Sequence, residues 1–210
     1  MKFSVAPRCR KGFTLVELLV VITIIVALAG VAFVTAQKAM NTAKERQSQK
    51  DCADLALSIN NFISDHQGVL PVDALANLSE DKPISTDVDD PANMISILMG
   101  REHGPEQDHI NRSGKKYVSG TPVDERRGGL YIEGRQMGLY DPWGKPYYVI
   151  LDVNGDEEIK DPTAKKNQDK PIFSRVIVYG TGLDGAGSQK DHKIQDPEYN
   201  SDNVYSWKKK

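Results

Sequence analysis

One long apolar run near the start of the chain limits what the rest of the sequence can become. The run extends from Phe13 to Ala36 with Glu17 as its one charged residue, and a short basic segment ending at Gly12 precedes it. As an α-helix, about two dozen residues extend ~36 Å, which is enough to cross a hydrocarbon core of ~30 Å. The sequence therefore predicts a membrane-spanning helix over residues 13–36.

Three kinds of N-terminal segment combine a basic head with an apolar run. A secretory signal peptide has an apolar core of only ~7–15 residues before its cleavage site, whereas here Ala27-Leu28-Ala29 lies well inside a longer run. A plain membrane anchor fits the length but does not account for Glu17, because a carboxylate at the membrane centre costs roughly 2.5–3.5 kcal/mol on insertion scales. The third interpretation gives that carboxylate a function.

Gly12, Phe13 and Glu17 together resemble the class III signal of type IV prepilins and of type II secretion pseudopilins. The resemblance implies that a prepilin peptidase removes residues 1–12 by cleaving between Gly12 and Phe13, and that the new amino terminus of Phe13 is N-methylated. It also implies a single-pass protein of the inner membrane whose C-terminal domain lies in the periplasm. Copies would then assemble with minor pseudopilins into a helical filament, on an inner-membrane assembly platform.

The charge of Glu17 suggests how such helices would assemble. The amine freed on Phe13 is a cation, and the amine of a neighbouring copy can neutralise the buried carboxylate. Removing one partner of a buried ion pair typically costs ~3–5 kcal/mol, so the pair would fix the register of adjacent helices. We therefore expect Glu17 to act in subunit assembly.

Charge and cysteine content exclude several classes of function. The leader holds four of the 27 basic residues and no acid, which leaves 23 basic against 29 acidic residues and a formal charge of −6. This is not the basic footprint of a nucleic-acid-binding protein. Cys9 leaves with the leader, so Cys52 has no partner for an intramolecular disulfide. Many type IV pilins close their C-terminal loop with a disulfide, and this chain must hold its own loops in another way.

The helix is expected to continue beyond the membrane as an amphipathic segment, residues 37–68. No Pro or Gly interrupts residues 37–67, Gly68 is a candidate C-cap, and Pro71 prevents continuation. Apolar residues recur at the i, i+3, i+4 and i+7 spacing of one helix face, and they are Cys52, Leu55, Ala56, Ile59, Phe62 and Ile63. The alternative is two helices with a break near Gly30 or Asn41.

Residues 69–210 are predicted to form one small globular domain with a polar excursion at residues 81–129. A short helix is expected from Pro91 to Met99, with Asp90 as its N-cap. Strands are expected near residues 116–118, 130–132, 147–151 and 172–179.

Asn154-Gly155 predicts a type I′ hairpin whose return strand begins near Glu158-Ile159. Together the elements predict an α+β, type IV pilin-like fold, in which the long N-terminal helix packs against a small antiparallel β-sheet.

Further segments resemble the major pseudopilin of type II secretion, the general secretion pathway protein G-like family. They are Asn60-Asn61-Phe62 with Gly68-Val69-Leu70-Pro71, then Asp141–Tyr147, Tyr179–Gly185 and Ser201–Trp207. The segment Asp141-Pro142-Trp143-Gly144 indicates a rigid turn with a buried indole, because Pro142 and the nearby Pro146 restrict the backbone and Gly144 allows positive φ. The chain departs from the family at Val34, where a Pro is common, and residues 81–129 lie outside the resemblance.

In major pseudopilins the loop that corresponds to residues 180–203 binds calcium. By that resemblance Asp184 and Asp202 are the strongest candidate ligands, and Ser188 and Asn203 are weaker ones. Calcium takes six to eight oxygen ligands in flexible geometry, and a bound ion would replace the missing disulfide as a clip on the C-terminal loop. A hydrophilic loop with scattered Asp residues and no ligand is the alternative.

Other motifs fail on their context. Gly180-x-Gly182-x-x-Gly185 is not followed by the helix that a dinucleotide site requires. The pattern Asp152-x-Asn154-x-Asp156 begins like an EF-hand loop. An EF-hand needs Gly after Asp156 and an acid at the twelfth position, whereas this chain has Glu157 and Thr163 there. No metalloprotease or serine hydrolase motif is present, and Cys52 lies on the apolar helix face, where an inert thiol is expected.

The sequence thus predicts a structural subunit of a secretion pseudopilus rather than an enzyme. A subunit of a type IV pilus and a membrane-anchored, calcium-dependent binding module remain as alternatives. In the second alternative, residues 81–129 would form the contact surface.

Overall fold

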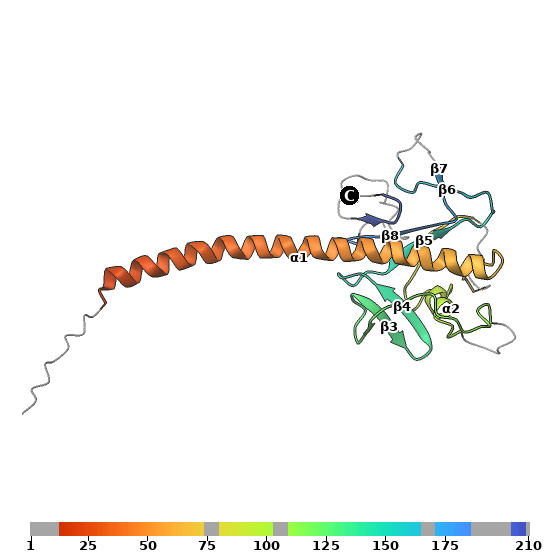
Figure 1. The fold of residues 1–210 in the computed structure, drawn as a ribbon, viewed down its shortest axis with the longest axis horizontal. Coiled ribbons are helices and arrows are strands. Elements are labelled where there is room, and N and C mark those ends of the chain that lie inside the picture. Colours follow the sequence, from red (N-terminus) through yellow and green to blue (C-terminus); the bar gives the residue numbers. More distant parts are fainter. Residues whose placement is uncertain (1–12, 74–79, 103–108, 165–170, 186–202, 209–210) are drawn as a thin grey trace, which may run out of the picture. The chain divides into compact units, whose positions relative to one another are not determined.

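The computed structural model describes residues 13–73, 80–102, 109–164, 171–185 and 203–208. The chain divides into two compact units, Met1–Thr42 and Ala43–Lys210. One continuous helix, α1, spans Leu15–Asp65 and passes from the first unit into the second (Figure 1). The alternative of two helices with a break near Gly30 or Asn41 is therefore wrong.

The first unit consists of the apolar part of α1. Its side chains are exposed all round the helix, from Leu15 through Val34. An 18-residue window of α1 has a mean hydropathy of 2.9, with none of the window buried. By length and composition α1 can cross a membrane, and it is the one helix among the described residues that can.

The second unit is built on the C-terminal part of α1. One face of this part is buried, as the spacing of apolar residues predicted, and its buried residues are Ser48, Cys52, Leu55, Ile59, Phe62 and Ile63. The helix ends in a Schellman-like turn, in which the Gly68 N–H donates to the Ile63 carbonyl at 2.8 Å. The left-handed residue before it is Gln67, with φ of 55°, so the helix-terminating conformation begins one residue before the expected Gly68.

The described residues of the second unit also form three small sheets (Figure 1). The largest is antiparallel, with the order β1-β5-β8-β9; it contains β1 (Ile84–Ser85), β5 (Tyr147–Leu151), β8 (Val176–Gly180) and β9 (Val204–Tyr205). The second contains β2 (Pro122–Val123), β3 (Gly129–Glu133) and β4 (Gln136–Tyr140), and β2 runs parallel to β3. The third pairs β6 (Glu158–Lys160) with β7 (Pro171–Phe173).

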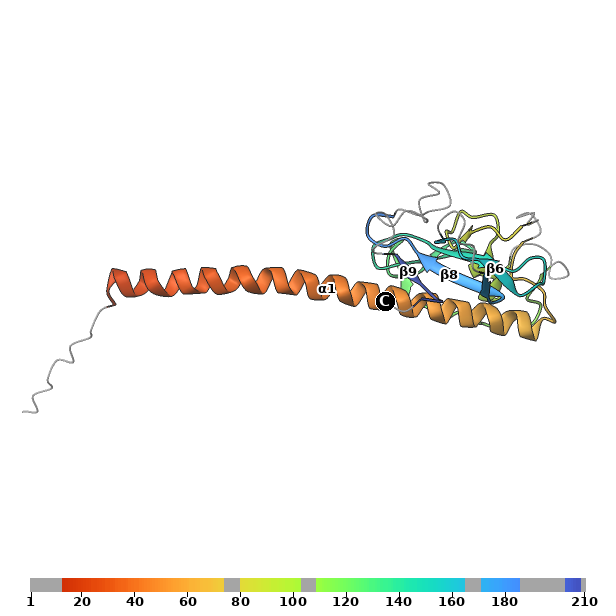
Figure 2. The same ribbon diagram turned by 90° about the horizontal axis from the view of Figure 1, so that it is seen from above.

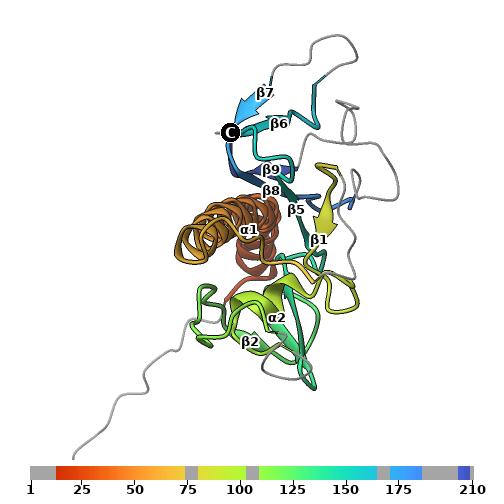
Figure 3. The same ribbon diagram turned by 90° about the vertical axis from the view of Figure 1, so that its right-hand side faces the viewer.

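The four-stranded sheet is buried on both faces. Alternate residues of β5 and β8, such as Val149 and Val178, join the helix residues in one apolar core. The intervening residues, such as Ile150 and Ile177, form a second cluster with Ile159 of β6. Figure 3 accordingly shows β8 and β9 between α1 and the β6–β7 pair. The fold is therefore α+β, with the long helix packed against antiparallel sheets, as predicted.

Short-range patterns misplaced several elements of this unit. The expected hairpin at Asn154-Gly155 is wrong, because β5 pairs with β1 and β8 and not with the strand that follows it. Instead, the Asp152 carboxylate accepts the N–H groups of Gly155 and Glu157 at 2.7 and 2.8 Å, which shapes a loop between two sheets. The predicted strand over 172–179 is two strands, β7 and β8.

The helix expected from Pro91 to Met99 is shorter, and α2 spans Met94–Leu98. Asn93 precedes it without a side-chain cap. The Asp90 carboxylate instead accepts the N–H groups of Ala92 and Ser85, at 3.0 and 3.2 Å, and so holds the turn before α2. No strand forms over residues 116–118, and the next strand of the excursion is β2.

The outer edge of β8 is covered by serine side chains as well as by β9. The Ser206 N–H donates to the Val178 carbonyl at 2.8 Å, and the Ser206 hydroxyl accepts the Val178 N–H at 2.9 Å. The Ser174 hydroxyl donates to the Val176 carbonyl at 2.7 Å and accepts the Val176 N–H at 3.3 Å. Figure 2 shows β9 alongside β8. Beyond the short β9, Ser206 and Ser174 occupy the backbone groups of β8 that would otherwise be unpaired.

Candidate functional site

The start of α1 is fixed by Thr14 and Glu17, whose side chains each accept a hydrogen bond from the other residue's backbone N–H. Thr14 donates from its N–H and from its hydroxyl to Oε2 of Glu17, at 2.8 and 2.7 Å. The Glu17 N–H donates in return to the Thr14 hydroxyl at 3.2 Å. This is a capping box, with Thr14 as the N-cap and Glu17 three positions later. A carboxylate in the first turn also interacts favourably with the helix dipole.

The capping box is a role of Glu17 that was not predicted from the sequence. The Thr-x-x-Glu pattern at residues 14–17 was the available signal. Both hydrogen bonds that the Glu17 carboxylate accepts end on Oε2, so Oε1 has no hydrogen-bond partner among the described residues and can accept a second one. Capping and pairing with a neighbouring amine are therefore compatible. Phe13, whose side chain is 82% exposed, lies outside the helix, and Gly12 lies outside the described residues.

A second candidate region is the turn that begins at Asp141. This residue is fully buried, and its Oδ1 accepts the N–H groups of Trp143 and Lys145 at 2.9 and 2.8 Å. Gly144 completes the turn with φ of 90°. The Trp143 side chain is half-buried, and its Nε1 has no partner among the described residues. The segment is therefore a rigid turn, as expected, with its indole less enclosed than predicted.

Burial governs the electrostatics of this turn. Desolvation raises the pKa of Asp141 to about 6, although its backbone hydrogen bonds favour the charged form. Its second oxygen, Oδ2, has no hydrogen-bond partner among the described residues. Nearby on α1, burial raises the pKa of Asp51, whose carboxylate accepts a bond from the Tyr147 hydroxyl at 3.0 Å. Burial likewise raises the pKa of Cys52 and so keeps it an unreactive thiol.

The C-terminal turn follows β8 and faces β9. Pairing of Gly180 with Val204 places Asn203 across from Thr181, and both side chains are buried. Neither Oδ1 nor Nδ2 of Asn203 has a hydrogen-bond partner among the described residues. Asp184 is exposed in the same turn, whereas Ser188 and Asp202 lie outside the described residues. Across residues 13–73, 80–102, 109–164, 171–185 and 203–208, no three His, Cys, Asp or Glu side chains form a metal-holding group.

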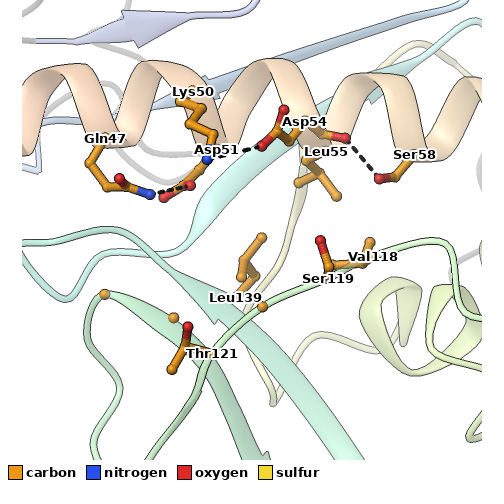
Figure 4. A pocket seen from close by; sticks show the side chains of 13 residues that line it. Gln47, Lys50, Asp51, Asp54, Leu55, Ser58, Val118, Ser119, Thr121 and Leu139 are labelled. Carbon is orange, nitrogen blue, oxygen red and sulfur yellow. Dashed lines mark hydrogen bonds and ion pairs between the residues drawn. The ribbon is translucent and has the colours of Figure 1, made fainter.

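A polar groove of about 420 Å³ runs between α1 and the loop that leads into β2 (Figure 4). Its helix wall includes Asp51 and Asp54, and its other wall includes Ser119 and Thr121. Gln47 donates to Asp51 at 2.7 Å. The residues that line the groove supply carboxylates and hydroxyls, and one amide and one ammonium group from Gln47 and Lys50.

The N-terminal part of the chain matches a known family model. A family model described as a prokaryotic N-terminal methylation motif matches residues 7–33. The match contains Gly12, Phe13 and Glu17 together with most of the exposed apolar helix. Comparison with curated proteins and with solved structures found no match.

Proposed function

This chain is a prepilin-like protein with an N-terminal methylation motif, and from that premise we propose that it is a structural subunit of a type II secretion pseudopilus. Proteins of this kind are processed by prepilin peptidase, held in the inner membrane before assembly, and structural rather than enzymatic. In the proposed assembly the C-terminal domain lies in the periplasm. The chain joins other copies of itself and minor pseudopilins on the inner-membrane platform.

The exposure of the first part of α1 is the observation that supports filament assembly. Its apolar side chains are exposed in the described part of the chain, and even Leu18 and Leu19 are 59% and 51% exposed. Lipid covers such a surface before assembly, and helices of other copies can cover it afterwards. Packing between those helices would supply the cohesion of the filament.

The secretion system is favoured over a pilus by residues of the second unit. Asp141–Tyr147 and Tyr179–Gly185 resemble the corresponding segments of major pseudopilins, and Cys52 is buried and free of a disulfide. A subunit of a type IV pilus, major or minor, is the second candidate, because the methylation motif is shared by both systems. Genes for a secretin and a secretion ATPase beside this one would favour the first candidate, and genes for a retraction ATPase the second.

A direct test of processing is the intact mass of the chain extracted from membranes. We expect a mass that corresponds to loss of residues 1–12 and gain of one methyl group on the amino terminus of Phe13. A Gly12→Arg variant, which places a bulky cation at the cleavage position, should retain the full-length mass. Recovery of the uncleaved wild-type chain from cells that contain the peptidase would contradict the proposal.

We further propose that the C-terminal turn binds calcium through Asp184, Asp202, Ser188 and Asn203. The amide oxygen of Asn203, which is buried and has no hydrogen-bond partner among the described residues, supports this, because such an atom is costly unless a ligand satisfies it. The exposed carboxylate of Asp184 is a hard oxygen donor of the kind that calcium prefers.

Calcium binding predicts a chelator effect on the folded chain. We expect EDTA to lower the melting temperature of the full chain in detergent micelles, because a ligand that binds only the folded state stabilises it. Asp184→Ala should remove that sensitivity, and Asp124→Ala, an exposed acid elsewhere, should retain it. Identical melting curves of the wild-type chain in EDTA and in calcium would rule out the site.

A further inference from the structure

Asn154-Gly155 is the sequence motif that the fold leaves without its predicted role. The pair does not form a hairpin and instead lies in the loop between β5 and β6, where both residues are exposed. It is the one Asn-Gly step of the sequence. A β-carbon built on Gly155 would meet no atom of the described residues within 4 Å, so none of them crowds this glycine.

An Asn-Gly step has a chemical reactivity of its own. The glycine nitrogen loses its proton to solvent and attacks Cγ of the asparagine, and the new C–N bond closes a succinimide ring. The Cγ–Nδ2 bond breaks, and the nitrogen takes a proton back from solvent and leaves as ammonia. Water then opens the ring at either carbonyl carbon, which gives aspartate or isoaspartate without any oxidant or reductant. Glycine favours the closure because it has no β-carbon and its backbone is conformationally free.

In the folded loop the Gly155 nitrogen is engaged by a carboxylate. Its N–H donates to Asp152 Oδ1 at 2.7 Å. Asp152 is only 8% exposed, and its Oδ2 accepts the Glu157 N–H at 2.8 Å, so both oxygens of the carboxylate are fixed. A carboxylate beside an N–H group favours the protonated nitrogen, because loss of the proton would place two negative charges side by side. The hydrogen bond therefore opposes the first step of the reaction.

The Asn154 side chain is held as well. Its Nδ2 donates to Asp156 Oδ2 at 2.8 Å, and its Oδ1 accepts the Asp156 N–H at 3.0 Å. Asp156 is itself fixed, because its Oδ1 accepts the Glu158 N–H at 2.9 Å. The amide thus has a partner at each end, and its nitrogen, which is the leaving group, is bonded to a carboxylate. Any rotation of the amide toward a new partner costs these two hydrogen bonds.

The surroundings of Asn154 make the product of the reaction unfavourable. Asn154 lines a cavity of about 600 Å³ together with four acidic residues and a lysine, which are Glu80, Asp81, Asp156, Glu158 and Lys160. A carboxylate at position 154 has no N–H to donate to Asp156, and like charges at short range repel. Conversion would therefore replace a hydrogen bond of the loop by a repulsion. Isoaspartate would also add a carbon atom to the backbone between β5 and β6.

We propose that Asn154-Gly155 is a modification site of this chain, where the amide is converted to aspartate and isoaspartate, and that the Asp152 carboxylate keeps the conversion slow while the loop is folded. The reaction needs water and no enzyme, so the inference is independent of the filament and of the calcium site. Loss of ammonia makes the conversion irreversible, so its rate sets how long a folded copy keeps its original loop.

The test follows the conversion in full chains held in detergent micelles at mildly alkaline pH. Samples taken over time are digested, and the mass and retention time of the peptide that contains residues 152–160 give the fractions of asparagine, aspartate and isoaspartate. We expect slow conversion in the folded wild-type chain and fast conversion in denaturant. In Asp152→Ala we expect a rate about tenfold higher than in the folded wild type, because a hydrogen bond to a charged group is lost.

Two further variants separate the carboxylate from a general loosening of the domain. Asp161→Ala removes a carboxylate that accepts the Thr163 N–H at 2.9 Å but has no Asn-Gly step beside it, so it should convert at the wild-type rate. Asp152→Asn keeps an oxygen acceptor of the same shape and loses the charge. It should convert faster than the wild type and more slowly than Asp152→Ala.

Each outcome supports or overturns the role of Asp152. Equal rates for the wild-type chain in buffer and in denaturant overturn it, and so does a wild-type rate in a folded Asp152→Ala chain. A rate in Asp161→Ala as high as in Asp152→Ala overturns it too. The melting transition in micelles shows whether Asp152→Ala is folded. If it is not, Asp152→Asn takes its place, where a wild-type rate overturns the proposal and a faster rate supports it.

Discussion

The Glu17→Ala chain is expected to remain in the membrane and to form no filaments. The substitution keeps the whole apolar run and removes two interactions at once. One is the capping box with Thr14, for which loss of a cap typically costs ~1 kcal/mol. The other is the proposed pair with a neighbouring Phe13 amine, where breaking a buried pair typically costs ~3–5 kcal/mol. The measurement is the fraction of the chain that sediments as filaments, compared with the fraction in membranes.

Two further variants separate capping from charge pairing. Glu17→Gln keeps a side chain that can complete a capping box but carries no charge, so we expect it to begin α1 normally and still fail to assemble. Thr14→Ala removes the cap and keeps the carboxylate, so we expect assembly to be weakened but present. Normal filaments from Glu17→Gln would refute the charge pairing and leave Glu17 with a structural role only.

The second large effect concerns the pH dependence of stability. Burial raises the pKa of Asp141 from 3.8 to about 6, so the folded state binds its proton more tightly than the unfolded state does. The contribution to stability is therefore complete below pH 3.8 and is lost as the pH rises through about 6. A shift of this size corresponds to at most about 3 kcal/mol. Urea unfolding of the full chain in micelles, at a series of pH values from 4 to 8, measures the slope.

The matched variant for this prediction is Asp141→Asn. Its amide oxygen can still accept the N–H groups of Trp143 and Lys145, but the side chain does not ionise. We expect the slope between pH 4 and 7 to become much shallower, whatever the absolute stability of the variant. Asp124→Asn, at an exposed carboxylate, should keep the wild-type slope. A slope that persists unchanged in Asp141→Asn would show that other groups cause it.

The sequence predicted the elements whose signal is local. The apolar run and the apolar face from Cys52 to Ile63 specify α1 by themselves, because helical bonds join residues four apart. The aromatic and β-branched run at residues 147–151 likewise predicted β5. Strand partners depend on distant segments, so no short pattern could show that β5 lies between β1 and β8.

The missed strands had weak local signals. β4 contains Gly138, where a β-carbon would lie 2.7 Å from the Val88 backbone nitrogen, so tertiary crowding rather than strand propensity selects that residue. β9 has only two residues, Val204 and Tyr205. It is a strand because these residues pair with Gly180 and Tyr179 at the edge of β8.

The candidate site divides in the same way. Gly12, Phe13 and Glu17 form a linear motif that the sequence alone can predict, and the Thr-x-x-Glu pattern of the capping box is local as well. The burial of Asn203 and of Thr181 depends on how β8 and β9 pair. Such contacts join residues far apart in the chain, and neither residue carries a signal of its own.

The hydrogen bonds from Ser174 and Ser206 to β8 also limit aggregation where many copies of the chain are close together. An unsatisfied strand edge is a template on which another chain can add a strand and begin aggregation. Because Ser174 and Ser206 already bond the outward backbone groups of Val176 and Val178, a neighbouring domain gains little by extending this sheet. A protein built to polymerise through one surface is in this way protected from polymerising through another.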